Sequence, residues 1–309
     1  MQPDLALTAK TAKTVEFYRD GQCTAALAMP ASVHELARSP DGSKLFGSVY
    51  GGGTFGRNVA PDRRIVIIDV ATQSVDGFIS TGVPLAPHGL KFGPDGLLWV
   101  TAELDKAIFA VDPVQRRVVA SIATGAAAHW LDVDQQDRFL YLANKGATAL
   151  GILDLRARRV VHQLEVPGGC EGLTLSTDGS WLFVASHETA QVHMVDVRTN
   201  RIVRSACVRA SAGKGCQLRR VRTSPDDQWL LMSSHQDGEV AIFSLPDLVQ
   251  SALVQVGRGP MGFSFPDKGG EALVCVHDEA RVARLDLACG KLLSAFATGE
   301  GCEYVQFLG

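Results

Sequence analysis

The chain has 309 residues, of which 46% are hydrophobic, and a formal net charge of −3. This apolar content suffices for a large core, whereas the weak negative charge without a basic run argues against nucleic acid or an anionic membrane as the main partner. No segment approaches the run of about 18 apolar residues that a membrane-spanning helix needs.

The N-terminal residues lack the charged and apolar regions of a signal peptide, and the seven cysteines include no Cys-x-x-Cys motif. We therefore expect a cytoplasmic protein, or a periplasmic one if a signal peptide has been removed. Cys170 and Cys302 are expected to be small buried apolar residues. Cys207 and Cys216 flank a glycine-rich insertion and could form a disulfide in an oxidising compartment, which the sequence leaves open.

Short strand-like segments follow one another along the whole chain. The first 33 residues contain three, at 5–8, 14–18 and 24–27. The clearest later unit has four, at 87–93, 97–101, 107–112 and 117–122, and the last segment is 303–308. Such runs of β-branched, aromatic and aliphatic residues between Gly, Pro and Asp are typical of strands. A turn of the type Ser39-Pro40-Asp41-Gly42 recurs, and the third segment of most units ends in Asp.

A four-residue segment recurs seven times at the start of these units, for example as Val33-His34-Glu35-Leu36 and Pro87-His88-Gly89-Leu90, and we call it the step. Its second residues are 54, 41, 42, 48, 42 and 42 positions apart. A repeat of about 42 residues with strand-type segments indicates a β-propeller in which each repeat is one four-stranded blade. The sequence thus predicts one all-β domain over residues 1–309, a seven-bladed propeller closed by N-terminal strands that pair with the C-terminal inner strand. The second residues of the seven steps are His34, His88, His129, Glu171, Arg219, Met261 and Glu303.

The units also resemble a known family. Pro94-Asp95-Gly96, the run Leu97–Thr101, the third strand ending in Val111-Asp112 and the fourth strand beginning Arg117-Val118-Val119 are similar to repeats of the YVTN/YncE-type seven-bladed propellers. The resemblance covers essentially the whole chain and implies the fold. It implies no particular activity, because one fold serves many functions.

Equivalent positions of a propeller form a ring around its axis, so the seven step residues should meet in one tunnel. The loops after the second strands open on the same face and carry Glu103, Lys145, His187, His235 and His277. A long insertion that starts at Tyr50 and includes Gly51-Gly52-Gly53 also belongs there and is interpreted as a flexible lid. His162 and His193 lie on outer strands and are expected at the surface.

Three imidazoles at equivalent positions of adjacent blades favour a metal site. We expect His34, His88 and His129, with Glu171 as a fourth ligand, to hold Fe, Cu, Mn or Zn with room for substrate. The alternative is that each histidine bonds a neighbouring backbone across a hydrated tunnel. Glu171 and Glu303 are the candidate catalytic carboxylates.

Arg219 is suited to bind a carboxylate or phosphate of the substrate. It could instead pair with Glu171 or Glu303. Further expected substrate contacts are Tyr50, Glu103, Lys145, His187, His235 and His277. The sequence therefore predicts a metal-dependent enzyme that acts on a small, anionic organic substrate in the central funnel. The alternative is a non-catalytic propeller that binds a protein or peptide on the same face. The oligomeric state is left open.

Overall fold

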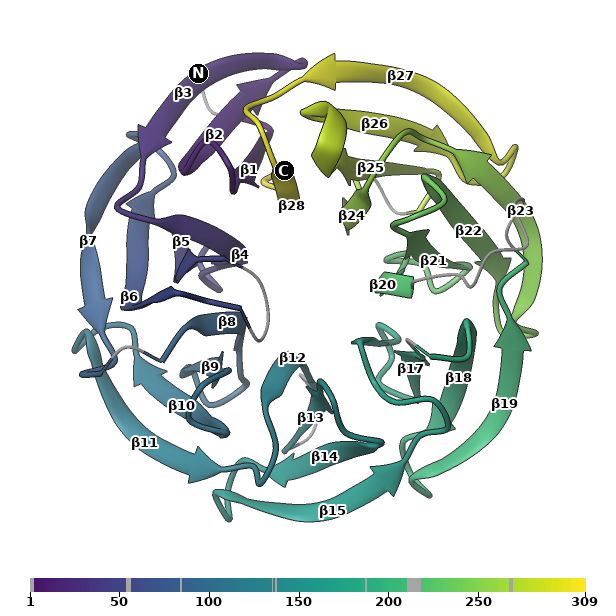
Figure 1. The fold of residues 1–309 in the computed structure, drawn as a ribbon, viewed down its shortest axis with the longest axis horizontal. Coiled ribbons are helices and arrows are strands. Elements are labelled where there is room, and N and C mark those ends of the chain that lie inside the picture. Colours follow the sequence, from purple (N-terminus) through teal and green to yellow (C-terminus); the bar gives the residue numbers. More distant parts are fainter. Residues whose placement is uncertain are drawn as a thin grey trace.

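The computed structural model describes residues 3–53, 57–83, 85–134, 136, 138–186, 188–209, 218–266 and 269–309. Seven antiparallel sheets of four strands each surround a central axis as the blades of a propeller (Figure 1). This arrangement confirms the predicted all-β, seven-bladed architecture. Within the described residues, no helix is long and apolar enough to cross a membrane.

Each blade runs from an inner strand at the axis to an outer strand at the rim. Blade 1 has β4 (Ser32–Arg38), β5 (Lys44–Gly52), β6 (Ala60–Asp69) and β7 (Ser74–Ser80). Blade 2 has β8 (Pro87–Phe92), β9 (Leu98–Ala102), β10 (Ala107–Asp112) and β11 (Arg117–Ala123). Blade 3 has β12 (Ala128–Val133), β13 (Phe139–Asn144), β14 (Ala149–Asp154) and β15 (Arg159–Glu165). Blade 4 has β16 (Gly172–Leu175), β17 (Trp181–Ala185), β18 (Gln191–Asp196) and β19 (Arg201–Cys207).

The remaining blades follow the same plan. Blade 5 has β20 (Leu218–Thr223), β21 (Trp229–Ser234), β22 (Glu239–Ser244) and β23 (Val249–Gln255). Blade 6 has β24 (Pro260–Ser264), β25 (Glu271–Val276), β26 (Arg281–Asp286) and β27 (Lys291–Ala297), with the short 3₁₀ helix η1 (His277–Glu279) between β25 and β26. Blade 7 has β28 (Cys302–Phe307), β1 (Leu5–Ala9), β2 (Thr14–Arg19) and β3 (Gln22–Ala28).

Blade 7 joins the two ends of the chain. Its inner strand β28 is C-terminal and pairs antiparallel with β1, so that Leu5 lies opposite Phe307 and Leu7 opposite Val305. The N-terminal strands β2 and β3 complete the sheet on its outer side. The closing contact therefore consists of backbone hydrogen bonds between the first and last strands of the protein.

The recurring turn and the recurring Asp have local causes. Ser39 donates its hydroxyl to Asp41 at 2.6 Å, and Gly42 adopts the left-handed conformation with φ 74° that completes the turn. The Asp at the end of a third strand accepts backbone N–H groups of the next turn, as Asp112 does from Val114 at 2.9 Å. These side chains set where one strand ends and the next begins.

The core lies between blades rather than inside any one of them. Trp99 and Ile108 of blade 2, for example, pack with Leu131 and Leu140 of blade 3 in one buried cluster. Because each sheet buries both faces against its neighbours, removing one blade exposes apolar surface on two others.

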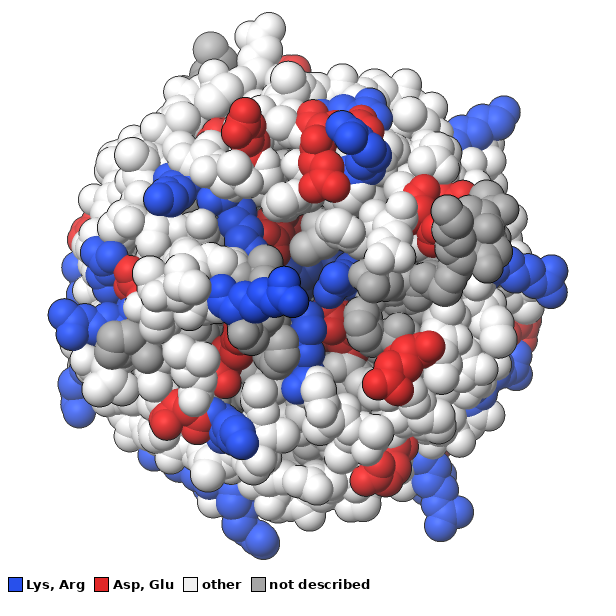
Figure 2. Space-filling view, viewed as in Figure 1, with Lys and Arg blue, Asp and Glu red and all other residues white. Residues whose placement is uncertain are grey.

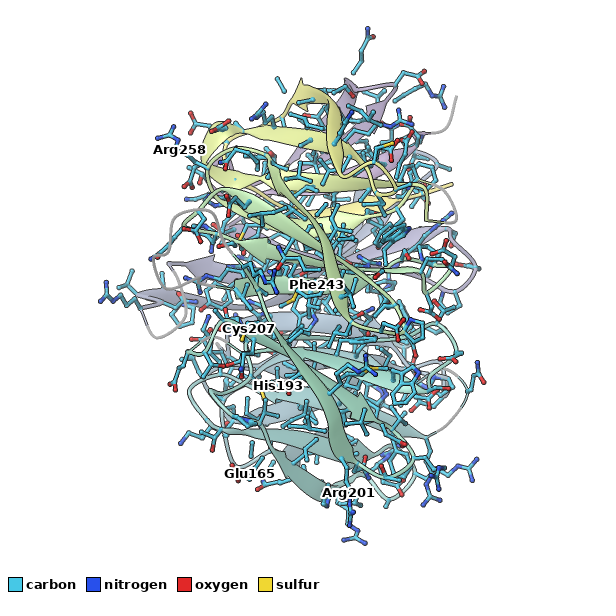
Figure 3. The ribbon with its side chains drawn as sticks, turned by 90° about the vertical axis from the view of Figure 1, so that its right-hand side faces the viewer. Glu165, His193, Arg201, Cys207, Phe243 and Arg258 are labelled. Atoms are coloured by element: carbon cyan, nitrogen blue, oxygen red, sulfur yellow. The ribbon has the colours of Figure 1, made fainter. Side chains whose placement is uncertain are left out.

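Two features differ from the sequence-based expectations. The prediction that His193 is a surface residue is wrong: it lies on β18 behind the outer strand (Figure 3), is buried, and contacts the Ser205 hydroxyl at 2.7 Å. An imidazole whose two nitrogens find partners is stable in the interior, and His193 also meets the Pro167 carbonyl at 3.1 Å. Gly51 and Gly52 extend β5 and pair with β6, so this part of the expected lid is a strand.

Other expectations concern exposure. His162 is exposed, and Cys170 and Cys302 are buried, as the sequence suggests. Cys216 lies outside the described residues, and so does most of the glycine-rich insertion that precedes it.

Candidate functional site

A cavity of about 500 Å³ opens on the axis of the propeller. Basic and acidic side chains gather around this central hollow (Figure 2). Nine of the residues predicted from the sequence line it: His34, His88, His129, Lys145, Glu171, Arg219, His235, His277 and Glu303. The rest of the described lining is Lys10, Arg57, Arg220, Met261 and Asp278. We call this cavity the central funnel.

The imidazoles of His34, His88 and His129 form a stack along one side of the funnel. They come from the adjacent inner strands β4, β8 and β12. The ring centroids of His88 and His129 are 3.8 Å apart, and those of His34 and His88 are 4.8 Å apart. Tyr50 closes the stack, with its ring 4.2 Å from that of His34. Its hydroxyl forms a short hydrogen bond to Glu103, so both side chains support the stack from behind.

The three imidazoles are neutral bases. Burial lowers the pKa of His34 and lowers the pKa values of His88 and His129 well below the usual range. Nearby positive charge acts in the same direction on His129, because Lys145 and Arg220 disfavour a second cation there. Among the described residues, Nε2 of His34 and Nδ1 of His88 have no hydrogen-bond partner. Both nitrogens are buried, so these two imidazoles keep an unused hydrogen-bonding position in the interior.

This stack does not fit a metal ion. A metal binds an imidazole in the plane of the ring, along the nitrogen lone pair, whereas the rings of His88 and His129 pack against each other with their centroids 3.8 Å apart and 37° between their planes. No group of three or more His, Cys, Asp or Glu side chains in the described part of the chain is arranged to hold a metal. Metal binding by these histidines and Glu171 stays a prediction.

Charged side chains line the funnel beside the stack. Glu171, which precedes β16, accepts hydrogen bonds from Lys145 at 2.8 Å and from Arg219 at 3.2 Å. Arg219 therefore pairs with Glu171, one of the two alternatives that the sequence left open. Glu171 is buried while the two basic side chains remain partly exposed, at 18% and 28%. The carboxylate thus holds two cationic groups at the edge of the cavity.

A second buried contact crosses the axis. Arg220 on β20 reaches Glu35 on β4 with 2.5 Å between Nη2 and Oε1, and these strands lie on opposite sides of the central opening (Figure 1). The guanidinium also lies 4.3 Å from the ring centroid of Trp130 on β12, a cation–π contact. Burial raises the pKa of Glu35 to about 8, although Arg220 opposes this shift. We call Glu35 and Arg220 the crossing pair.

Glu303 connects the imidazole stack with the charged groups. Its carboxylate lies 3.1 Å from Nδ1 of His34, 3.5 Å from Lys10 and 3.7 Å from Arg220. Burial alone would raise the pKa of Glu303, but contact with His34, Lys10 and Arg220 outweighs burial and holds it well below the usual range. Glu303 is therefore an ionised carboxylate in a fixed position.

Sequence reasoning missed the third residue of two steps, Glu35 and Arg220. The pairing register of inner strands shifts at the step, for instance between Val33 and Leu36 and between Leu218 and Val221. Such a bulge lets two consecutive residues point toward the axis, which explains how Glu35 follows His34 and Arg220 follows Arg219 into the tunnel.

Hydroxyl groups of the second strands hold these bulges. Ser48 accepts the N–H of Glu35 at 3.1 Å and Ser233 accepts that of Arg220 at 3.0 Å. Thr101 also donates its hydroxyl to the carbonyl of His129 at 2.9 Å, across to the next blade. A Ser or Thr in the middle of an otherwise apolar second strand is therefore the sequence signal that could have located the bulges.

Most of the expected loop residues also reach the funnel. His235 and His277 line the cavity, and Nδ1 of His277 contacts Asp278 at 2.8 Å. Burial lowers the pKa of His235. His187 lies outside the described residues.

Comparison with known proteins agrees with the fold. The family model of the YncE-like β-propellers matches residues 59–219, more than half of the chain. The chain belongs to this family. No curated protein matches the sequence.

Solved structures that resemble this YncE-like chain have diverse roles. A periplasmic gluconolactonase of Pseudomonas aeruginosa has a TM-score of 0.83 and 18% identity, with 100% of this chain and 99% of the other covered. A Kuenenia stuttgartiensis hydrazine synthase has a TM-score of 0.76 and 19% identity over 88% of both chains. A protein of unknown function from Desulfotomaculum acetoxidans has a TM-score of 0.80 and 11% identity over 98% of both. At these identities the likeness concerns the fold alone.

Proposed function

We propose that this protein is an enzyme that hydrolyses a small organic anion, a carboxylate-bearing lactone or related ester, in the central funnel. The observation that carries the proposal is that neutral imidazoles and fixed cationic groups line the same cavity. Five basic and three acidic side chains give the described lining a formal net charge of +2 with neutral histidines. The cavity volume of about 500 Å³ suits a small ligand.

The two sides of the funnel suit two parts of such a reaction. On the charged side, Arg219 and Lys145 bind the substrate carboxylate while Glu171 holds them in place. On the other side, His88 or His129 takes a proton from the attacking water, because a neutral imidazole is a suitable general base. A basic side chain of the cavity lining then stabilises the negative charge that develops on the carbonyl oxygen of the substrate.

The carboxylates are less suited to act as the base. Glu171 and Glu303, the catalytic candidates of the sequence analysis, are both engaged in ion pairs with basic residues. The name of the similar Pseudomonas protein, a gluconolactonase, is compatible with hydrolysis of a cyclic ester on this scaffold. A metal is no part of the proposal, because the stacked imidazoles do not fit one.

Assays of lactones and esters, with and without a carboxylate, test this function. Hydrolysis can be followed at constant pH by the base needed to neutralise the acid that is formed. We expect His88→Ala or His129→Ala to lower kcat by about 10²–10⁴-fold. Arg219→Ala should mainly raise KM for carboxylate-bearing substrates, and His162→Ala, on the exposed outer strand β15, is the matched control.

Two results would contradict the enzyme proposal. If no lactone or ester is turned over, or if His88→Ala and His129→Ala keep the parental rate, the imidazoles are not catalytic. Binding of a protein or peptide to this face without any turnover would support the non-catalytic alternative instead.

A further inference from the structure

Two cysteines meet inside the protein where the ring of blades closes. Cys275 lies on β25 of blade 6 and Cys302 at the start of β28 in blade 7. Their Sγ atoms are 2.8 Å apart, and both residues have 0% of their surface exposed. This separation is shorter than the usual distance of about 3.5–4.0 Å between non-bonded heavy atoms, and a disulfide bond is about 2.05 Å long.

The cysteine pair lies where a bond would attach the closing strand β28 to blade 6. Strand β28 is the inner strand of blade 7 and provides the edge with which N-terminal β1 pairs. Cys302 itself lies opposite Ala9 in that pairing. A covalent bond from Cys302 to blade 6 would fasten the strand on which the N-terminal strands assemble.

We propose that Cys275 and Cys302 form a disulfide bond that fastens the closing strand of the propeller to blade 6. This inference is independent of the enzymatic function proposed above. The two thiols lose two protons and two electrons to an external oxidant, a low-molecular-weight disulfide such as glutathione disulfide, which is reduced to two thiols. The bond forms through a mixed disulfide between one cysteine and glutathione, and the thiolate of the other cysteine then attacks the cysteine sulfur and releases glutathione as a thiol.

Burial determines when this reaction occurs. In the closed propeller neither sulfur is accessible, and burial together with the neighbouring Cys302 raises the pKa of Cys275 well above its usual value. Because the thiolate is the reactive form, oxidation of the folded protein should be slow. The bond should form during folding, before β28 docks between blades 6 and 1.

Refolding with and without oxidant tests the proposal on the unmodified sequence. After refolding in glutathione disulfide and glutathione, we expect an intact mass lower by two hydrogen atoms and a peptide map that joins Cys275 to Cys302. The oxidised protein should have a Tm higher by roughly 5 °C than the same protein after reduction, as expected for a cross-link that closes a loop of this kind. Native protein that is exposed to the same oxidant should gain the bond at least about tenfold more slowly.

Single substitutions provide the controls. Cys275→Ala and Cys302→Ala should each remove the linked peptide and the difference in Tm between oxidised and reduced protein. Cys170→Ala, which also replaces a buried thiol but in blade 4, should keep both. The proposal is overturned if all thiols of the correctly refolded parent can be alkylated after denaturation without reductant, or if the mapped bond joins other cysteines.

Discussion

The two sides of the central funnel use the same repeat position in different ways. On blades 1 to 3 the position holds His34, His88 and His129, which stack ring on ring and stay neutral. On blades 4 and 5 it holds Glu171 and Arg219, which form an ion pair. Equivalent positions of the repeat thus carry side chains of different chemistry on the two groups of blades.

This comparison shows how one propeller separates two chemical tasks. Lys145 and Arg220 help to keep His129 neutral, and Lys145 and Arg219 give the same cavity cationic groups that can attract an anion. Glu303 on β28 lies at the boundary, since it contacts both His34 and Arg220.

Deleting residues 302–309 should have the largest effect, because it removes this boundary together with β28. Blade 7 loses its inner strand, β1 loses its pairing edge, and Glu303 no longer neutralises Arg220. We expect most of the free energy of unfolding to be lost, measured by thermal and urea denaturation. A truncated protein that melts like the parent would contradict closure by β28.

Arg220→Ala should be next in size. It leaves the buried carboxyl group of Glu35 without its cation and removes one of the two basic side chains beside Glu303, and breaking a buried ion pair on one side typically costs about 3–5 kcal/mol of unfolding free energy. Arg219→Ala is the matched control on the neighbouring residue, whose partly exposed pair with Glu171 should contribute about 0–1 kcal/mol. Equal losses in the two variants would show that the crossing pair has no special role.

The imidazole stack should make the protein sensitive to acid. Since the pKa values of His88 and His129 are lowered in the folded state, the unfolded chain binds protons first as the pH falls. The unfolding free energy should therefore decrease below about pH 6.5, by up to about 1.4 kcal/mol per pH unit for each imidazole. His88→Gln should remove one such contribution in urea titrations at several pH values, and an unchanged pH dependence would argue that His88 is not buried as a neutral base.

The metal content of the protein should distinguish a stack of imidazoles from the metal site predicted by the sequence. Of the four substitutions and deletions, we expect His129→Ala to have the smallest effect on the quantity measured. Because the faces of His88 and His129 meet, we expect less than stoichiometric Fe, Cu, Mn or Zn in elemental analysis of untagged protein purified without chelator. His129→Ala should then leave the metal content unchanged. A stoichiometric metal that His129→Ala removes would restore the metal-site prediction and would require the stacked rings to separate.

The sequence predicts the fold well because the repeat fixes it. The spacing of the steps sets the number of blades, and turns such as Ser39–Gly42 set the strand boundaries through contacts that are local in the chain. The ring residues follow from the same register, which is why nine of the expected site residues line one cavity.

What the sequence could not provide depends on side-chain geometry across the axis. A period of about 42 residues places three histidines at one level but cannot tell whether their nitrogens converge or their rings stack. Arg220 and Glu35 were missed because regular alternation in a strand turns the residue after Arg219 or His34 away from the axis. Only the bulges, which Ser48 and Ser233 support, bring both side chains inward.

The crossing pair has a consequence for how molecules enter and leave. Arg220 and Glu35 connect β20 and β4 across the axis and so occupy part of the central passage. In the proposed hydrolysis, an anionic substrate and an anionic product would both meet the cationic side chains of Lys145 and Arg219. An anionic product would therefore linger there and compete with the next substrate, and the turnover of such an enzyme would slow as its own product accumulates.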